Sequence, residues 1–191
     1  MRVLAFDQAP QNNGFAYGEA DANLAPIWGI KTFPNFEDND QLLMRAAKPW
    51  LTNLIAEARP NKIYFEQVLR TPNFQVFYQQ VSMVCCIMYC ALEAGIVAEQ
   101  VFISDWRARG LGKTNKPKWG VDGDDKWLKE AAMLACADRG WLIDNHNAAE
   151  AALIWDWGCA DASKAYMSAT KPRVARVLYE RENKDRAFNG K

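Results

Sequence analysis

The stretch MRVLAFDQAPQNNGFAYG, residues 1–18, decides the fold that the rest of the chain must complete. Its apolar start predicts a buried strand over Arg2–Asp7, and a second strand is predicted over Gly14–Glu19 after a polar turn, Gln-Asn-Asn-Gly. The first strand ends on a carboxylate, where an unpaired buried charge is costly. Asp7 is therefore either a residue that begins a turn or part of a site that needs its charge.

Length and composition indicate a globular protein and exclude little else. The chain has 191 residues, half of them apolar, which suits one domain with a substantial core. The formal net charge is zero, so a basic surface for a polyanion must be local. The five cysteines show neither zinc spacing nor a disulfide framework, which predicts reduced core thiols in a cytoplasmic protein.

No targeting or membrane segment is expected. No charged and apolar leader precedes the first predicted strand. The most apolar stretch, residues 81–98, contains Glu93 and Gly95 and falls short of the roughly 20 residues that a membrane span requires. We therefore expect a buried helix there.

The remaining pattern alternates strands and helices. Pro49 is expected to kink or split one of the helices, and Ser104 or Asp105 to cap a short helix. Strands are predicted over 27–33, 62–65 and 101–103, helices over 38–58, 74–94, 124–138 and 147–165, and a surface loop over 110–123. These elements predict an α/β domain over residues 1–168, built on a mixed five-stranded sheet, followed by a basic extension over 169–191.

Two further acids stand where the pattern favours chemistry. Glu66 ends the strand over 62–65, as Asp7 ends the first one, and strand ends are where α/β folds carry their sites. Glu150 is framed by alanines on a predicted helix, which allows that helix to lie close to the sheet. Asn147 and His146 precede Glu150 by one helical turn. In the alternative interpretation, Asp144, Asn145 or Asn147 caps the helix and His146 is a surface residue.

Converging carboxylates favour hard divalent cations. Mg²⁺ and Mn²⁺ prefer oxygen ligands and use few protein carboxylates together with water and phosphate. A pair of such ions activates water on one side of a phosphodiester and stabilises the leaving oxygen on the other. We therefore expect two Mg²⁺ or Mn²⁺ ions per active site, as in nucleases.

Three motifs then resemble those of RuvC-type Holliday junction resolvases, the crossover junction endodeoxyribonucleases. They are LAFDQAPQNNGFAY, IYFEQV and HNAAEAALIW, and the match covers about residues 2–158. The resemblance implies an RNase H-like fold with helices on both faces of the sheet, and makes Asp7, Glu66 and Glu150 metal-binding catalytic acids. The earlier acid of the last motif falls on Asn147, so Asn147, His146 or Asp144 is left to serve the second ion or the attacking water.

The same resemblance implies contacts with DNA and a partner subunit. Leu69 or Phe74 would insert at a junction centre, although either suits the core at a helix start. The apolar helix at 81–92 would form a homodimer, although burial within a monomer is the alternative. Basic residues that would hold the phosphate backbone, or simply form a solvated surface, are Arg107, Lys113, Lys116, Lys118 and Lys126, with Arg109 and Lys129 nearby.

The sequence therefore predicts a metal-dependent, structure-selective endodeoxyribonuclease that resolves Holliday junctions and other branched DNA by paired cleavage. Such an enzyme would serve DNA recombination and repair in the cytoplasm of a bacterial cell, or of one infected by a phage. Because Asn147 replaces an acid, a catalytically weak or dead protein that binds branched DNA is the alternative. An actin-like ATPase would need two such domains, for which the chain is too short.

Overall fold

A five-stranded mixed sheet organises the chain in the computed structural model, which describes residues 1–9, 11–36, 39–69, 71–112 and 126–170. The strand order is β3-β2-β1-β4-β5, with β1 pairing antiparallel to β2 and parallel to β4. This arrangement confirms the predicted fold class. The strands are β1 Arg2–Asp7, β2 Asn12–Glu19, β3 Ile27–Thr32, β4 Lys62–Glu66 and β5 Val97–Val101.

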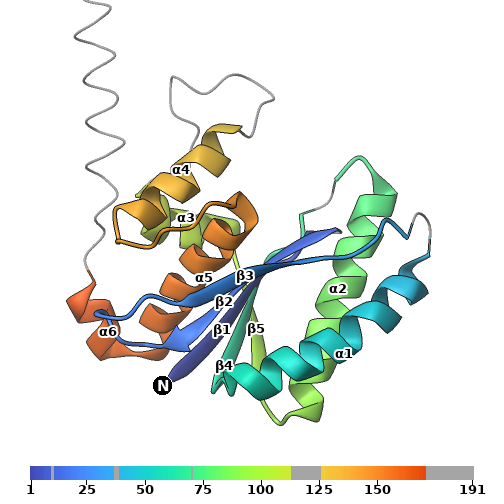
Figure 1. Ribbon diagram of the computed structural model, residues 1–191, viewed down its shortest axis with the longest axis horizontal. Coiled ribbons are helices and arrows are strands. Elements are labelled where there is room, and N and C mark those ends of the chain that lie inside the picture. Colours follow the sequence, from blue (N-terminus) through green and yellow to red (C-terminus); the bar gives the residue numbers. More distant parts are fainter. Residues whose placement is uncertain (10, 37–38, 70, 113–125, 171–191) are drawn as a thin grey trace, which may run out of the picture.

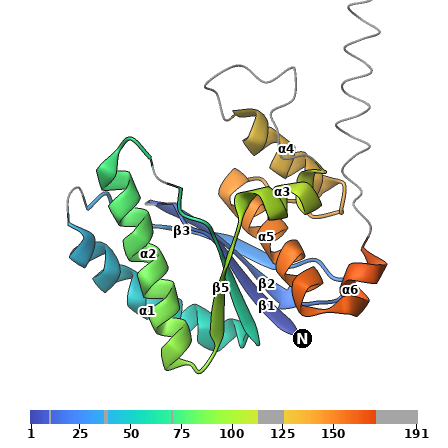
Figure 2. The same ribbon diagram turned by 180° about the vertical axis from the view of Figure 1, so that it is seen from behind.

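Helices cover both faces of the sheet (Figures 1 and 2). One face carries α1 Asp40–Ala58 and α2 Phe74–Glu93, and the other carries α3 Ile103–Leu111, α4 Lys126–Ala137, α5 His146–Ala162 and α6 Lys164–Ala169. Successive side chains of β1 point to opposite faces of the sheet and so contribute to the core on each face. Val3 and Ala5 join the core beneath α5, and Leu4 and Phe6 join the core beneath α1 and α2. Burial on both faces explains why β1 reads as a continuous apolar run.

Several predicted boundaries are wrong, among them that of the helix predicted over 147–165, which ends at Ala162 before the separate helix α6. Strand β2 begins at Asn12, so Asn12–Gly14 belong to a strand and not to the turn. Strand β5 lies at Val97–Val101 rather than 101–103, and it escaped notice because this edge strand carries polar residues between its valines. Helix α3 then begins at Ile103 after Phe102, without a side-chain cap, so neither expected cap residue serves there.

Helix α1 continues through Pro49 and is not split there. Proline removes one backbone donor from a helix. Buried side chains on both sides of it, among them Leu43, Ala47, Leu51 and Leu54, hold the two halves against the same core. Packing of the apolar face outweighs the local cost of the proline.

Helix α2 buries one of its faces within the chain, so the helix expected to be buried here is covered on one side only. Its buried side includes Met83 and Ile87, whereas an apolar stripe remains exposed. By length and composition α2 could cross a membrane, which corrects the expectation that this segment is too short; in this fold it packs against α1. The exposed stripe, called the α2 stripe below, consists of Tyr78, Cys85, Met88, Tyr89 and Leu92.

All five cysteines are free, as expected, and four of them are buried. The exception is Cys85, which lies exposed on α2. The predicted loop beyond Gly112 and the basic extension from Lys171 lie outside the described residues.

Candidate active site

Asp7 and Glu66 occupy the same edge of the sheet because their strands are parallel neighbours. The β1–β4 register pairs Phe6 with Phe65 as its last residues, and each acid follows directly. Asp7 is 6% exposed, and Glu66 is half-buried. The carboxyl ends of parallel strands thus bring two carboxylates together, as the sequence predicted.

Glu150 reaches this edge because α5 packs unusually close to β2. Asp7 pairs with Gly14 on β2, and a Cβ atom built on Gly14 would lie 2.1 Å from the carbonyl oxygen of Asn147. Only glycine permits that approach. The alanines around Glu150 are fully buried, so the helix lies flat on the sheet and Glu150 meets Asp7.

Burial disfavours the ionisation of all three carboxyl groups, and neighbouring carboxylates add to this effect at Asp7 and Glu150. Burial, followed by the charges of Glu150 and Glu66, raises the pKa of Asp7 well above its usual range. Burial and the charge of Glu66 raise the pKa of Glu150 to about 7, and a side-chain hydrogen bond links Asp7 with Glu150. Burial also raises the pKa of Glu66, against the opposing effects of Trp106 and Arg107. The cluster therefore carries negative charge only at a cost.

Nearby cations offset this charge only from a distance. The positive charge of Arg107 lowers the pKa values of all three acids, and Lys129 lowers that of Glu150. Among the ion pairs of the described residues, none includes Asp7, Glu66 or Glu150. Such a site is short of positive charge, which is the electrostatic condition that a bound cation would relieve.

The donor set suits a hard cation that takes few protein ligands. In the described part of the chain, no three His, Cys, Asp or Glu side chains form a ready cluster for a metal ion. Magnesium usually takes one or two carboxylates and completes its shell with water and substrate phosphate. The contact of Asp7 with Glu150, with Glu66 close by, fits that mode.

The start of α5 separates the candidates for the second ion. Asn145 is the N-cap and accepts from the backbone N–H groups of Asn147 and Ala148, so the capping interpretation is correct for this residue. Asn147 is buried and donates its Nδ2 to the carbonyl of Asn12 over 2.8 Å, which leaves only its side-chain oxygen for a ligand. Asp144 is exposed and precedes the cap.

His146 lies at the first position of α5 beside Glu150. Burial and the charge of Lys129 lower the pKa of this imidazole, so it is mainly neutral at neutral pH. A pocket of about 580 Å³ adjoins the acids, and His146, Asn147, Glu150 and Lys129 line it together with residues of the α2 start. Lys129, which the sequence placed only beside the predicted basic surface, is therefore also a pocket residue.

Two buried residues that hold Glu66 escaped sequence reasoning. Trp106 donates its Nε1–H to Glu66 Oε1 over 2.9 Å. Gln8 accepts from the Glu66 backbone N–H at 3.1 Å and donates to its carbonyl at 2.5 Å. A glutamine after a strand resembles turn material, and a tryptophan beside a helix start resembles core, so neither carries a sequence signal of its own.

The predicted DNA-binding residues divide into three groups. Leu69, between β4 and α2, is 52% exposed, and Phe74, the first residue of α2, is 58% exposed, so they are not core residues. Arg107 is close enough to the acids to influence their pKa values, whereas Arg109 turns away and pairs with Asp156. Lys113, Lys116 and Lys118, and the side chain of Lys126, lie outside the described residues.

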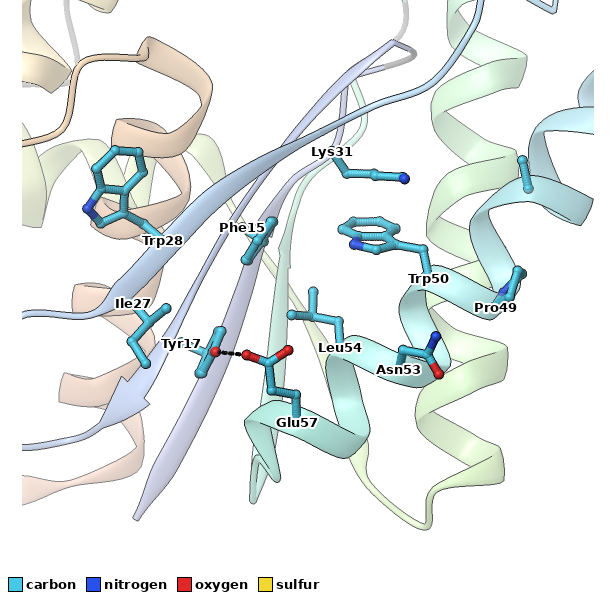
Figure 3. A pocket seen from close by; sticks show the side chains of 11 residues that line it. Phe15, Tyr17, Ile27, Trp28, Lys31, Pro49, Trp50, Asn53, Leu54 and Glu57 are labelled. Atoms are coloured by element: carbon cyan, nitrogen blue, oxygen red, sulfur yellow. Dashed lines mark hydrogen bonds between the residues drawn. The ribbon is translucent and has the colours of Figure 1, made fainter.

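A second pocket, of about 510 Å³, lies on the α1 face of the sheet (Figure 3). Phe15 and Trp50 form an edge-to-face pair with ring centroids 6.0 Å apart, and the Tyr17 hydroxyl donates to Glu57. This face is opposite α5 and the alanines around Glu150. The pocket is therefore separate from the three acids.

Comparisons with known proteins agree with this geometry. No protein-family model and no curated protein matches the sequence. Among solved structures, the chain is similar to RuvC of Thermus thermophilus, alone (TM-score 0.64, 15% identity) and in complex with a Holliday junction substrate (0.64, 14%); each alignment covers 90% of this chain and 99% of that one. It is also similar to Ydc2, the yeast mitochondrial Holliday junction resolvase (TM-score 0.60, 11% identity, 87% of this chain and 82% of that one). At these identities the likeness shows the fold, and it confirms the fold expected from the three motifs.

Proposed function

We propose that this protein is a metal-dependent endonuclease that cuts Holliday junctions and other branched DNA. The observation that carries the proposal is the cluster of Asp7, Glu66 and Glu150, three acids with raised pKa values and no ion-pair partner among the described residues. Groups of acids with raised pKa values reduce the stability of the fold and are typical of functional sites. Similarity to structures of junction resolvases supports DNA as the substrate.

The metal ligands would be Asp7, Glu66 and Glu150, with the side-chain oxygen of Asn147 or the neutral imidazole of His146 at a second Mg²⁺ or Mn²⁺ ion. When bound, the two ions would supply an activated water and stabilise the leaving 3′ oxygen. Arg107 and Lys129 contribute positive charge beside the acids and would hold the phosphate backbone. The exposed side chains of Leu69 and Phe74 would enter the open centre of the junction.

A homodimer would place two such sites on opposed strands. The α2 stripe is apolar, exposed and continuous along one helix, as an interface between two copies requires. Sedimentation of the wild-type chain beside Leu92→Glu tests this part. We expect a dimer that the substitution converts to a monomer; a wild-type monomer at micromolar concentration would contradict it.

Incubation of the protein with labelled DNA tests the activity. The substrates are a four-way junction, a flap and a linear duplex, each with Mg²⁺ or Mn²⁺, and the variants are Asp7→Asn and the exposed control Asp138→Asn. We expect paired nicks on the junction that disappear in Asp7→Asn alone. Binding without cleavage in either metal would instead favour a non-catalytic DNA-binding protein, which the neutral Asn147 at an acid position also suits.

A further inference from the structure

The ladder between β1 and β4 ends next to the acids, because its register stops at Phe6 and Phe65. On the other side of β4, Gln67 donates its N–H to the Val101 carbonyl, so the ladder with β5 continues further along the chain. The N–H and C=O of one strand residue point to the same side, and those of the next residue point to the other side. The N–H and C=O of Glu66 therefore face β1 where this ladder ends.

The side chain of Gln8 extends the pairing at this point. Its Oε1 accepts from the Glu66 N–H and its Nε2 donates to the Glu66 C=O, so one amide side chain forms a further rung between β1 and β4. Gln8 is 3% exposed, so water does not readily substitute for it. Since Gln8 directly follows Asp7, the same rung fixes the separation of the Asp7 and Glu66 backbones.

Trp106 completes the restraint from the other end of Glu66. The indole is fully buried, and its N–H fixes one carboxylate oxygen. The backbone of Glu66 is thus held by Gln8 and its carboxylate by Trp106. We propose that Gln8 and Trp106 are positioning residues that pre-set Glu66 against Asp7 for a divalent cation.

This inference rests on the proposed function, because it gives the restraint a role in metal binding. The Gln8→Met variant keeps the length of the side chain and removes both hydrogen bonds. Gln100→Met is the matched control, since Gln100 is exposed on β5 of the same sheet and pairs with Phe65 rather than with an acid. Urea unfolding of each variant establishes that it is folded.

Three measurements test the restraint. Amide hydrogen exchange followed by NMR should show the Glu66 N–H exchanging about tenfold faster in Gln8→Met, the equivalent of one lost hydrogen bond. Calorimetric titration with Mn²⁺, without DNA, should show a Kd raised about tenfold, as for other residues that orient metal ligands. On junction DNA, kcat should fall while the Kd for the junction stays constant, and Trp106→Phe should change both Mn²⁺ affinity and kcat in the same direction.

The outcomes separate the two proposals. If Gln8→Met loses protection at Glu66 but keeps wild-type Mn²⁺ affinity and kcat, the rung is merely structural and the inference is overturned. Unchanged exchange at Glu66 would show that the rung does not form, which overturns the inference as well. If the wild-type chain neither binds Mn²⁺ nor cuts DNA, the proposed function fails first, and the role of Gln8 in metal binding fails with it.

Discussion

Helix α5 carries two acids, one buried and one half-buried, whose surroundings are opposite. Asp156, in its second half, is 2% exposed and pairs with Arg109 at 2.9 Å and Arg139 at 3.6 Å, while the Tyr166 hydroxyl donates to it over 2.7 Å. Glu150, near its start, faces two other acids and has no ion pair among the described residues. The first acid is fully compensated and connects α3, the turn after α4, and α6 to α5. The second acid has no such partner. This difference separates an acid whose charge is neutralised within the fold from one whose charge is not.

Removing the compensated acid should have the largest effect. Asp156→Ala leaves two arginines largely buried without their partner, and breaking a buried pair in this way costs about 3–5 kcal/mol of unfolding free energy. Urea denaturation at pH 7 measures the loss. Asp138→Ala, at an exposed acid on α4's end, should stay within about 0.5 kcal/mol of wild type. A loss below about 1 kcal/mol at Asp156 would show that the arginines are solvated already.

Removing the uncompensated acid should do the opposite. Glu150→Gln eliminates a charge whose pKa is about 7, so at pH 8 without metal the variant should be more stable than wild type by about 1–3 kcal/mol. Urea denaturation in EDTA measures this gain, with Glu93→Gln as a surface control on α2. A destabilised Glu150→Gln would mean that the carboxylate is already stabilised in the free protein.

The pH dependence sharpens the contrast. Asp7, Glu66 and Glu150 have higher pKa values in the folded chain than in the unfolded chain, so between about pH 5 and 8 the folded chain binds more protons. The free energy of unfolding without metal should therefore fall by about 1–2 kcal/mol as the pH rises through this range. The lowered pKa of His146 acts in the opposite sense, and subtracting the Glu150→Gln profile isolates the carboxyl contribution. Calorimetric melting at a series of pH values measures how stability depends on pH, once in EDTA and once in Mg²⁺. A metal-free profile that rises over this range would contradict the unpaired state of the acids.

The smallest effect is expected from removing a single hydrogen-bond donor to Asp156. Tyr166→Phe removes one of the donors to Asp156 and leaves both arginines, so it should cost about 1 kcal/mol of unfolding free energy. Tyr78→Phe, at an exposed tyrosine of α2, is the control and should change nothing measurable by urea denaturation. A cost near that of Asp156→Ala would show that the hydroxyl, rather than the arginines, is the main partner of Asp156.

The sequence predicts the uncompensated site better than the compensated one, for a physical reason. Asp7 and Glu66 end apolar strands and Glu150 has an alanine frame, so burial and charge are both visible in the local pattern. Arg109 was instead grouped with the basic surface, because its partner Asp156 is distant in sequence and only tertiary packing joins them. Strand β5 was displaced for a related reason, since an edge strand exposes polar side chains and shows no apolar run.

The contact at Gly14 affects how genetic data on this protein would be interpreted. Any side chain there would push the Asn147 carbonyl, and the whole start of α5, away from β2. Under the proposed function, a screen for inactive variants would therefore recover Gly14 substitutions beside those of Asp7 and Glu150, although glycine has no side chain that reacts or binds. A Gly14 variant would therefore resemble a variant of a catalytic residue in its phenotype. Second-site substitutions on α5 that restore its packing against β2 can rescue a Gly14 variant, but they cannot rescue an Asp7 variant.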